Sequence, residues 1–152
     1  MSIAGTTNAA TATTTTDPTM MARLIRGVVG GLAGGLVFGA MMQMMGAIPM
    51  IAMLVGSEST AVGWLVHLGI SAALGFGFGL VVGNRLTSLL VTVGLGVGYG
   101  VVWWVLGALI AMPVALGMPP FTLDTMAWLS LMGHMTYGAV LALVAFMLAR
   151  RA

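Results

Sequence analysis

Two histidines interrupt long apolar stretches of this sequence, and they are its first candidates for chemistry. His67 lies in "GWLVHLGIS" and His134 in "LSLMGHMTYG", and the chain has no other histidine. A neutral imidazole donates one hydrogen bond, accepts another, titrates near neutral pH and ligates metals. Since an unpaired polar group is costly in apolar surroundings, both residues need partners or a function.

Hydroxyl and amide side chains occur where they can supply such partners. Ser71 follows His67 by four residues and Tyr137 follows His134 by three, so on a helix each shares a face with its histidine. Gln43 and Thr136 are two further polar side chains in these stretches. We predict one polar cluster inside the fold, made of Gln43, His67, Ser71, His134, Thr136 and Tyr137.

Three functional interpretations of this cluster stay open, beside a structural one in which neutral imidazoles join helices by hydrogen bonds. The first is a small-solute or proton site around His67 and His134, although no Asp or Glu lies within the apolar stretches to couple to a proton. The second is a copper or haem site with the same two histidines as ligands. In the third, the protein is a structural or accessory subunit of a membrane complex, and it binds other membrane proteins through its glycine faces.

Copper is suggested by the 15 methionines, because thioether and imidazole ligands suit Cu(I). Methionine is also a flexible apolar side chain that fills gaps between helices. No haem-attachment motif is present, and the chain has no cysteine. We therefore expect no cofactor, with His67 and His134 as the ligands if a metal is bound.

Catalysis and nucleic-acid binding are not expected. Asp124 and Ser130 lie near His134, but no nucleophile motif surrounds that serine. The run "GLGVGYG" resembles a dinucleotide-binding pattern, yet it lies inside an apolar stretch with no strand before it. Five arginines against three acidic residues are too small a surplus to indicate nucleic acid.

Composition places these residues in a membrane. Hydrophobic residues make up 60% of the chain and charged residues 5%, whereas soluble domains carry roughly 25% charged residues. Four apolar stretches are long enough to cross the bilayer as helices, and they cover about residues 24–45, 62–82, 88–111 and 125–148. The sequence predicts an all-α integral membrane protein with four transmembrane helices in residues 23–152. Residues 1–22, rich in Thr and Ala, are predicted to form a disordered tail.

The charged residues predict an orientation. If both termini are cytoplasmic, Glu58 and Asp124 lie outside and all five arginines lie inside, namely Arg23, Arg26, Arg85, Arg150 and Arg151. Cytoplasmic loops of membrane proteins carry an excess of Lys and Arg. We therefore predict a cytoplasmic tail and a cytoplasmic C-terminus, with the lipid bilayer as the principal partner.

Glycine recurs at intervals of four residues, which lets helices approach closely in lipid. The runs are Gly27/Gly31/Gly35/Gly39, Gly75/Gly79/Gly83, and Gly94/Gly98 beside Gly96/Gly100. They predict close packing within one bundle. A glycine face that is not used for packing within the bundle would instead contact a second copy of the chain or another membrane protein.

The two halves of the sequence resemble each other. Pro49 corresponds to Pro113, Trp64 to Trp128 and His67 to His134. A unit of two helices preserves direction, so the pattern predicts two tandem helix hairpins related by an axis along the membrane normal.

The segment "MPVALGMPPFTLD" separates the last two apolar stretches. Pro113, Pro119 and Pro120 are expected to end the helix, and Phe121 adds an apolar side chain. We predict that these four residues fold back over the outer face as a lid above the histidines. A cover without a gating role is the alternative.

The motifs "GMPPFTLD" and "GHMTYG" resemble those of the YagU-like bacterial inner-membrane proteins over about residues 62–149. The matching positions are His67, Pro119, Pro120, Phe121, Gly133, His134 and Tyr137. The first helix and the tail do not match. The resemblance implies a multi-pass protein of the bacterial inner (cytoplasmic) membrane, with a suggestion of acid or stress tolerance and no defined activity.

Overall fold

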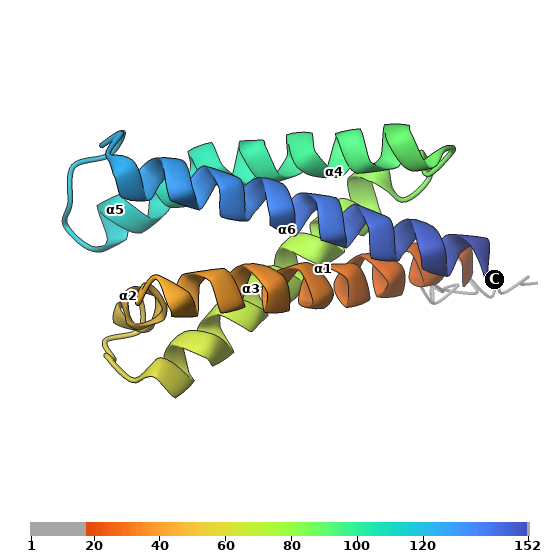
Figure 1. The fold of residues 1–152 in the computed structure, drawn as a ribbon. Coiled ribbons are helices and arrows are strands. Elements are labelled where there is room, and N and C mark those ends of the chain that lie inside the picture. Colours follow the sequence, from red (N-terminus) through yellow and green to blue (C-terminus); the bar gives the residue numbers. More distant parts are fainter. Residues whose placement is uncertain (1–17, 152) are drawn as a thin grey trace, which may run out of the picture.

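The computed structural model describes residues 18–151, and every regular element among them is helical (Figure 1). This confirms the predicted all-α class. The elements are α1 (Pro18–Met44), α2 (Ile48–Met53), α3 (Thr60–Val82), α4 (Leu89–Trp103), the π-helix η1 (Trp104–Ala111), α5 (Met112–Ala115) and α6 (Thr125–Arg150).

Four helical stretches are long and apolar enough to cross a membrane: Thr19–Met44, Thr60–Val82, Leu89–Ala115 and Thr125–Arg150. Each has at least the roughly 20 residues that a ~30 Å hydrocarbon core requires. The chain therefore has the architecture of a multi-pass membrane protein.

Helix α1 begins earlier than the sequence suggested. It starts at Pro18, so residues 18–22, which we assigned to the tail, are helical. Proline is favourable in the first turn of a helix, where its missing N–H has no intrahelical acceptor. The rest of the predicted tail, residues 1–17, lies outside the described residues.

The third span also runs further than predicted, because Pro113 does not end it. The helix continues through η1 and α5 to Ala115. Pro113 has no N–H for the carbonyl four residues earlier, that of Leu109. The N–H of Phe121 donates to this oxygen instead, at 2.9 Å, and Phe121 adopts a left-handed φ of 58° to do so.

The helices are arranged around a central pair. Helices α1 and α6 lie side by side, α3 packs on α1, and α4 packs on α6 (Figure 1). Helices α3 and α4 approach each other near their connecting loop and diverge toward the opposite end. The inner helices α1 and α6 therefore pack along each other, whereas the outer helices α3 and α4 do not. The predicted tandem repeat stays a prediction.

Glycines set the close contacts. A Cβ at Gly75 in α3 would collide with the backbone carbonyl of Gly27 in α1, and a Cβ at Gly96 in α4 would collide with that of Gly138 in α6. Most of the predicted glycine runs therefore serve packing within the bundle. Gly94 and Gly98 face away from the other helices, with no atom near their Cβ positions.

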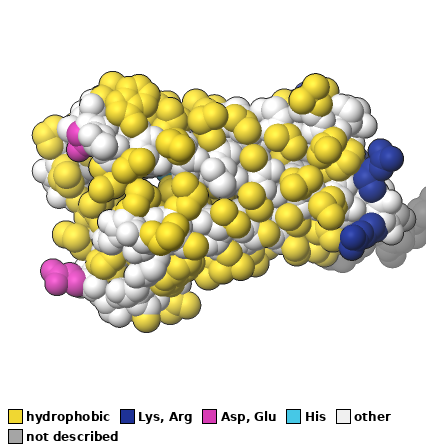
Figure 2. Space-filling view, in the orientation of Figure 1, with side chains coloured by type: hydrophobic (Ala, Val, Ile, Leu, Met, Phe, Trp, Pro, Cys, Tyr) yellow, Lys and Arg dark blue, Asp and Glu magenta, His cyan; other side chains and the backbone are white. Residues whose placement is uncertain are grey.

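Charge divides between the two ends of the bundle. Figure 2 shows Arg side chains at one end, acidic side chains at the other, and an apolar surface between them. The first turns of α1, the α3–α4 loop and the end of α6 form the arginine end. The opposite end carries Glu58 and Asp124, and we call it the acidic end.

Candidate functional site

Both histidines line one cavity toward the acidic end of the bundle. This histidine cavity has a volume of about 410 Å³, and its lining is almost entirely apolar. Helices α1 and α6 form its back, while α3 and η1 form its sides. Residues from α2 and α5 complete it at the acidic end. Ligand pockets in proteins typically occupy about 300–1,000 Å³ and are mostly apolar with a few polar groups.

Each imidazole is held by a backbone carbonyl. His67 Nε2 lies 2.9 Å from the carbonyl oxygen of Gly35, and His134 Nδ1 lies 2.8 Å from that of Ser130. A carbonyl only accepts hydrogen bonds, so these two ring nitrogens carry the protons of neutral imidazoles. The other nitrogens, Nδ1 of His67 and Nε2 of His134, have no hydrogen-bonding partner among the described residues. Each is therefore an acceptor available to a ligand.

Three hydroxyls lie beside the histidines: Ser130 Oγ is 3.3 Å from His134 Nδ1, while those of Ser71 and Tyr137 donate to backbone carbonyls. Ser71 Oγ donates to the His67 carbonyl at 2.7 Å, and the Tyr137 hydroxyl donates to the Ser71 carbonyl at 2.8 Å. Both residues are only 3% exposed. The Tyr137 bond joins α6 to α3 across the back of the cavity. Both hydrogen atoms are thus committed to carbonyls, and neither hydroxyl has a hydrogen left to donate.

Phe38 of α1 contacts both histidines. Its ring meets His67 and His134 edge-on, with centroids 5.6 Å and 4.8 Å apart respectively. Gly133 makes room for this ring, because a Cβ at that position would overlap Phe38. Phe38 therefore lies in contact with both imidazoles at the back of the cavity.

A tyrosine joins α4 to α3 beside the cavity, on the side of the arginine end. The Tyr99 hydroxyl of α4 donates to the Leu74 carbonyl of α3 at 2.7 Å, and its ring packs edge-on against Phe78. Nearer the acidic end, α3 and η1 make little contact with each other. Ile70 of α3 and Gly107 of η1 both line the cavity, and Ile70 is 42% exposed, so the cavity is partly open on this side of the bundle.

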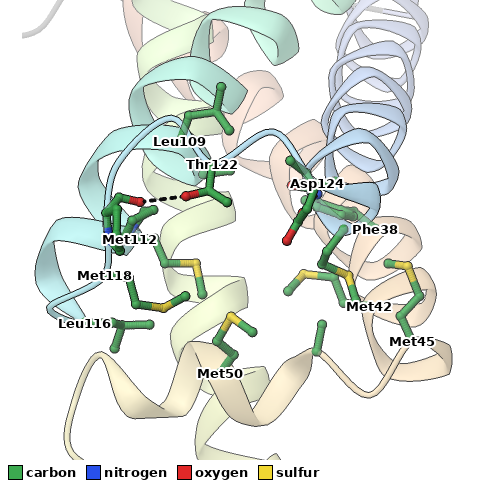
Figure 3. A pocket seen from close by; sticks show the side chains of 17 residues that line it. Phe38, Met42, Met45, Met50, Leu109, Met112, Leu116, Met118, Thr122 and Asp124 are labelled. Carbon is green, nitrogen blue, oxygen red and sulfur yellow. Dashed lines mark hydrogen bonds between the residues drawn. The ribbon is translucent and has the colours of Figure 1, made fainter.

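A second pocket of about 180 Å³ lies beyond the first, at the acidic end. Six of its lining residues are methionines: Met42, Met45, Met50, Met112, Met118 and Met126. We call it the methionine pocket (Figure 3). It shares Phe38, Met42 and Met112 with the histidine cavity, so the two spaces adjoin.

The structure brings together four of the six residues in the predicted cluster. His67, Ser71, His134 and Tyr137 all line the histidine cavity, whereas Gln43 and Thr136 lie elsewhere. Gln43 Oε1 accepts a hydrogen bond from Trp64 Nε1 at 3.0 Å on an exposed face. Thr136 Oγ1 donates to the carbonyl of Met132 one turn earlier, at 2.8 Å. Thr136 is thus bonded within its own helix, whereas Gln43 joins α1 to α3 outside the histidine cavity.

The four residues of the predicted lid separate into two pairs. Pro113 and Pro119 line the methionine pocket, but Pro120 and Phe121 line neither space. Phe121 is 56% exposed. The loop therefore covers the methionine pocket rather than the histidines directly, and a gating role stays a prediction.

Three elements of the site were not predicted from the sequence: Phe38, Tyr99 and the π-helical wall. Met112 N–H bonds to the Gly107 carbonyl, five residues earlier, which widens the helical turn beside the cavity. Gly107 and Ala108 leave that wall without bulky side chains. Only the pair of small residues within "WVLGALIA" offered a signal.

No group of three or more His, Cys, Asp or Glu side chains suited to a metal occurs in the described part of the chain. The copper and haem interpretations at His67 and His134 therefore stay predictions. No protein-family model, curated protein or solved structure matches the chain. The resemblance to the YagU-like proteins has no support from these comparisons.

Proposed function

We propose that this multi-pass membrane protein binds a small, largely apolar molecule in the histidine cavity. One observation carries the proposal: two neutral imidazoles, each with one unpaired nitrogen, line a single apolar space that is partly open on one side of the bundle. In a bilayer such an opening faces lipid, so a ligand would enter from the membrane. We place the protein in a bacterial inner membrane, on the resemblance alone.

The imidazoles specify the polar end of the ligand. The bonds to the Gly35 and Ser130 carbonyls leave only acceptor nitrogens on the two histidines. A ligand that satisfies them must donate hydrogen bonds, as an alcohol, a phenol or an N–H group does. An analogue without the donor leaves a nitrogen desolvated and unpaired.

A proton relay is less well supported by this geometry. A relay needs groups that both receive and release a proton, but the hydroxyls of Ser71 and Tyr137 end at backbone carbonyls. Among the described residues, the Ser130 hydroxyl contacts only the His134 nitrogen that is also bonded to the Ser130 carbonyl. The Tyr99–Leu74 bond also joins α4 to α3 beside the cavity on the side of the arginine end. We therefore favour a binding site over a path across the bundle.

The orientation of the protein is part of the proposal. All arginines lie at one end of the bundle, and this end faces the cytoplasm by the positive-inside rule. Alkaline phosphatase fused after the C-terminus should stay inactive, while a green fluorescent protein fused there should fluoresce. Active phosphatase would reverse the orientation and place the histidine cavity in the inner leaflet.

The binding proposal is testable with 1-naphthol, an apolar phenol, and 1-methoxynaphthalene, which lacks the donor. Dialysis against the full chain in nanodiscs, with empty nanodiscs as the background, measures both affinities. We expect 1-naphthol to bind about tenfold more tightly, as expected for one hydrogen bond worth ~1.4 kcal/mol. His67→Phe with His134→Phe should remove this preference. Equal binding of the two probes to the native chain would contradict the proposal.

A matched pair of glycine substitutions tests where the probe binds. Gly107 lines the histidine cavity and has open space at its Cβ position, so Gly107→Phe should fill the cavity. Gly98 has the same open space but faces away from the bundle. Gly107→Phe should abolish saturable 1-naphthol binding, and Gly98→Phe should leave it intact.

A further inference from the structure

The methionine pocket gathers thioethers from distant parts of the chain. Met42 and Met45 come from the end of α1 and the turn after it, Met50 from α2, and Met126 from α6. Six of the chain's fifteen methionines line this one pocket, which has only a few other large side chains. Figure 3 shows the labelled members of this set around one space, with Asp124 at its edge.

Three of the six methionines are exposed residues. Met50, Met118 and Met126 are 38%, 52% and 43% exposed, so they are not committed to filling a core. A methionine side chain has three rotatable bonds and a polarisable sulfur. The three thioethers are thus free to turn toward a shared ion, with Met42, Met45 and Met112 behind them.

Thioether sulfur selects for soft metal ions. Met suits Cu(I), whereas Mg²⁺ and Ca²⁺ require oxygen ligands and a structural zinc site uses Cys or His. Six thioethers with no cysteine or histidine in the lining leave Cu(I) as the matching biological cation. Because thioethers are neutral, such a site keeps the positive charge of the ion.

One carboxylate is placed to balance that charge. Asp124 lines the methionine pocket, and its Oδ1 accepts a hydrogen bond from the Ala127 N–H at 2.8 Å as the cap of α6. This bond fixes the carboxylate at the pocket edge and leaves Oδ2 without a protein partner among the described residues. The only other described acid, Glu58, lies outside the lining.

We infer that the methionine pocket is a binding site for Cu(I), held by the thioethers of Met50, Met118 and Met126 with the carboxylate of Asp124 nearby. This site is distinct from a copper site at the histidines, whose lining contains neither these three methionines nor Asp124. It is also independent of the proposed binding of an apolar molecule. In the proposed orientation it faces the outside.

Silver provides the direct test, because Ag(I) shares the soft chemistry of Cu(I) and does not change oxidation state in air. The full chain in detergent is dialysed against silver nitrate in chloride-free buffer, and bound silver is measured by mass spectrometry. We expect one tightly bound ion per chain. The triple variant Met50→Leu, Met118→Leu, Met126→Leu keeps apolar side chains of similar size. It should bind at least about a hundredfold more weakly, because loss of even supporting partners costs about 10–100-fold in metal affinity.

A matched control removes the same number of methionines from lipid-facing positions: Met44→Leu, Met132→Leu and Met147→Leu, whose side chains are also exposed. It should bind Ag(I) as the native chain does. Asp124→Asn retains a good helix cap and should weaken binding less than the methionine triple. Equal losses in the two triples, or no stoichiometric silver in the native chain, would overturn the inference.

A further comparison separates this site from the histidines. His67→Phe with His134→Phe should leave silver binding unchanged and remove only the preference for 1-naphthol. X-ray absorption of the Cu(I)-loaded native chain should then show sulfur neighbours without imidazole. Loss of silver binding in the histidine variant would move the metal to the histidine cavity and refute the methionine site.

Discussion

The two ends of the bundle are packed in different ways. At the arginine end glycine meets backbone, as where Gly27 meets Gly75 and Gly96 meets Gly138. Toward the acidic end two glycines meet rings instead, Gly39 at Trp64 and Gly133 at Phe38, although Gly63 there still meets the Ile48 carbonyl. Small residues on both helices bring the backbones together, whereas a ring on one helix holds the other away.

This difference explains where the cavities lie. Helices that touch through glycine leave no space between them, and the arginine end has neither of the two pockets. Rings and methionines keep the helices apart at the acidic end, where the π-helix and short helices complete the walls. The protein thus combines a rigid half, which holds the helices, with a more open half that can bind ligands.

The largest expected effect comes from placing a methyl group in the rigid half. Gly75→Ala puts a Cβ against the Gly27 carbonyl, and backbone cannot move aside as a side chain can. We expect a loss of about 3 kcal/mol in the free energy of unfolding, the upper end for overpacking, measured by titration with a denaturing detergent. Gly69→Ala on the same helix has open space and should change stability little. If Gly75→Ala and Gly69→Ala lowered the stability equally, this half of the bundle would not be rigid.

An intermediate effect is expected from the same change in the open half. Gly133→Ala puts a Cβ against the Phe38 ring, which can rotate into the adjoining cavity. The loss should be about 1–2 kcal/mol, smaller than for Gly75→Ala, and binding of 1-naphthol should weaken because the ring takes up space. A loss as large as that of Gly75→Ala would show that the open half is equally rigid.

The smallest effect is expected at the boundary between the halves. Tyr99→Phe keeps the ring and removes only the hydrogen bond to the Leu74 carbonyl. We expect a loss of about 0.6 kcal/mol, the average for such bonds between helices in a membrane. Hydrogen exchange should quicken in α3 near Leu74 and stay unchanged near Gly27. A uniform change along α3 would mean that Tyr99 does not mark a boundary.

Some features of the site could be read from residue spacing. On one helix, side chains three or four residues apart share a face, and Ser71 lies with His67, and Tyr137 with His134, in the lining of the histidine cavity. The structure places Gln43 and Thr136 outside this lining. Spacing shows which residues share a face of one helix, but it does not show which face points toward the neighbouring helices. Pro113 was also misjudged, since the residue that compensates for its missing N–H, Phe121, is eight positions away and reaches Leu109 only through the folded loop.

The sequence by itself determined the membrane class and four spans, because apolar length and scarcity of charge are properties of single segments. It also determined that the arginines gather at one end. Only the tertiary structure decided that the two histidines share one cavity, with Phe38 against both, and that six methionines surround another. Such groupings depend on the relative rotation and tilt of helices. The rotation and tilt depend on whether a glycine of one helix contacts the backbone or a ring of the next. Such a contact is known only when the residues on both helices are known.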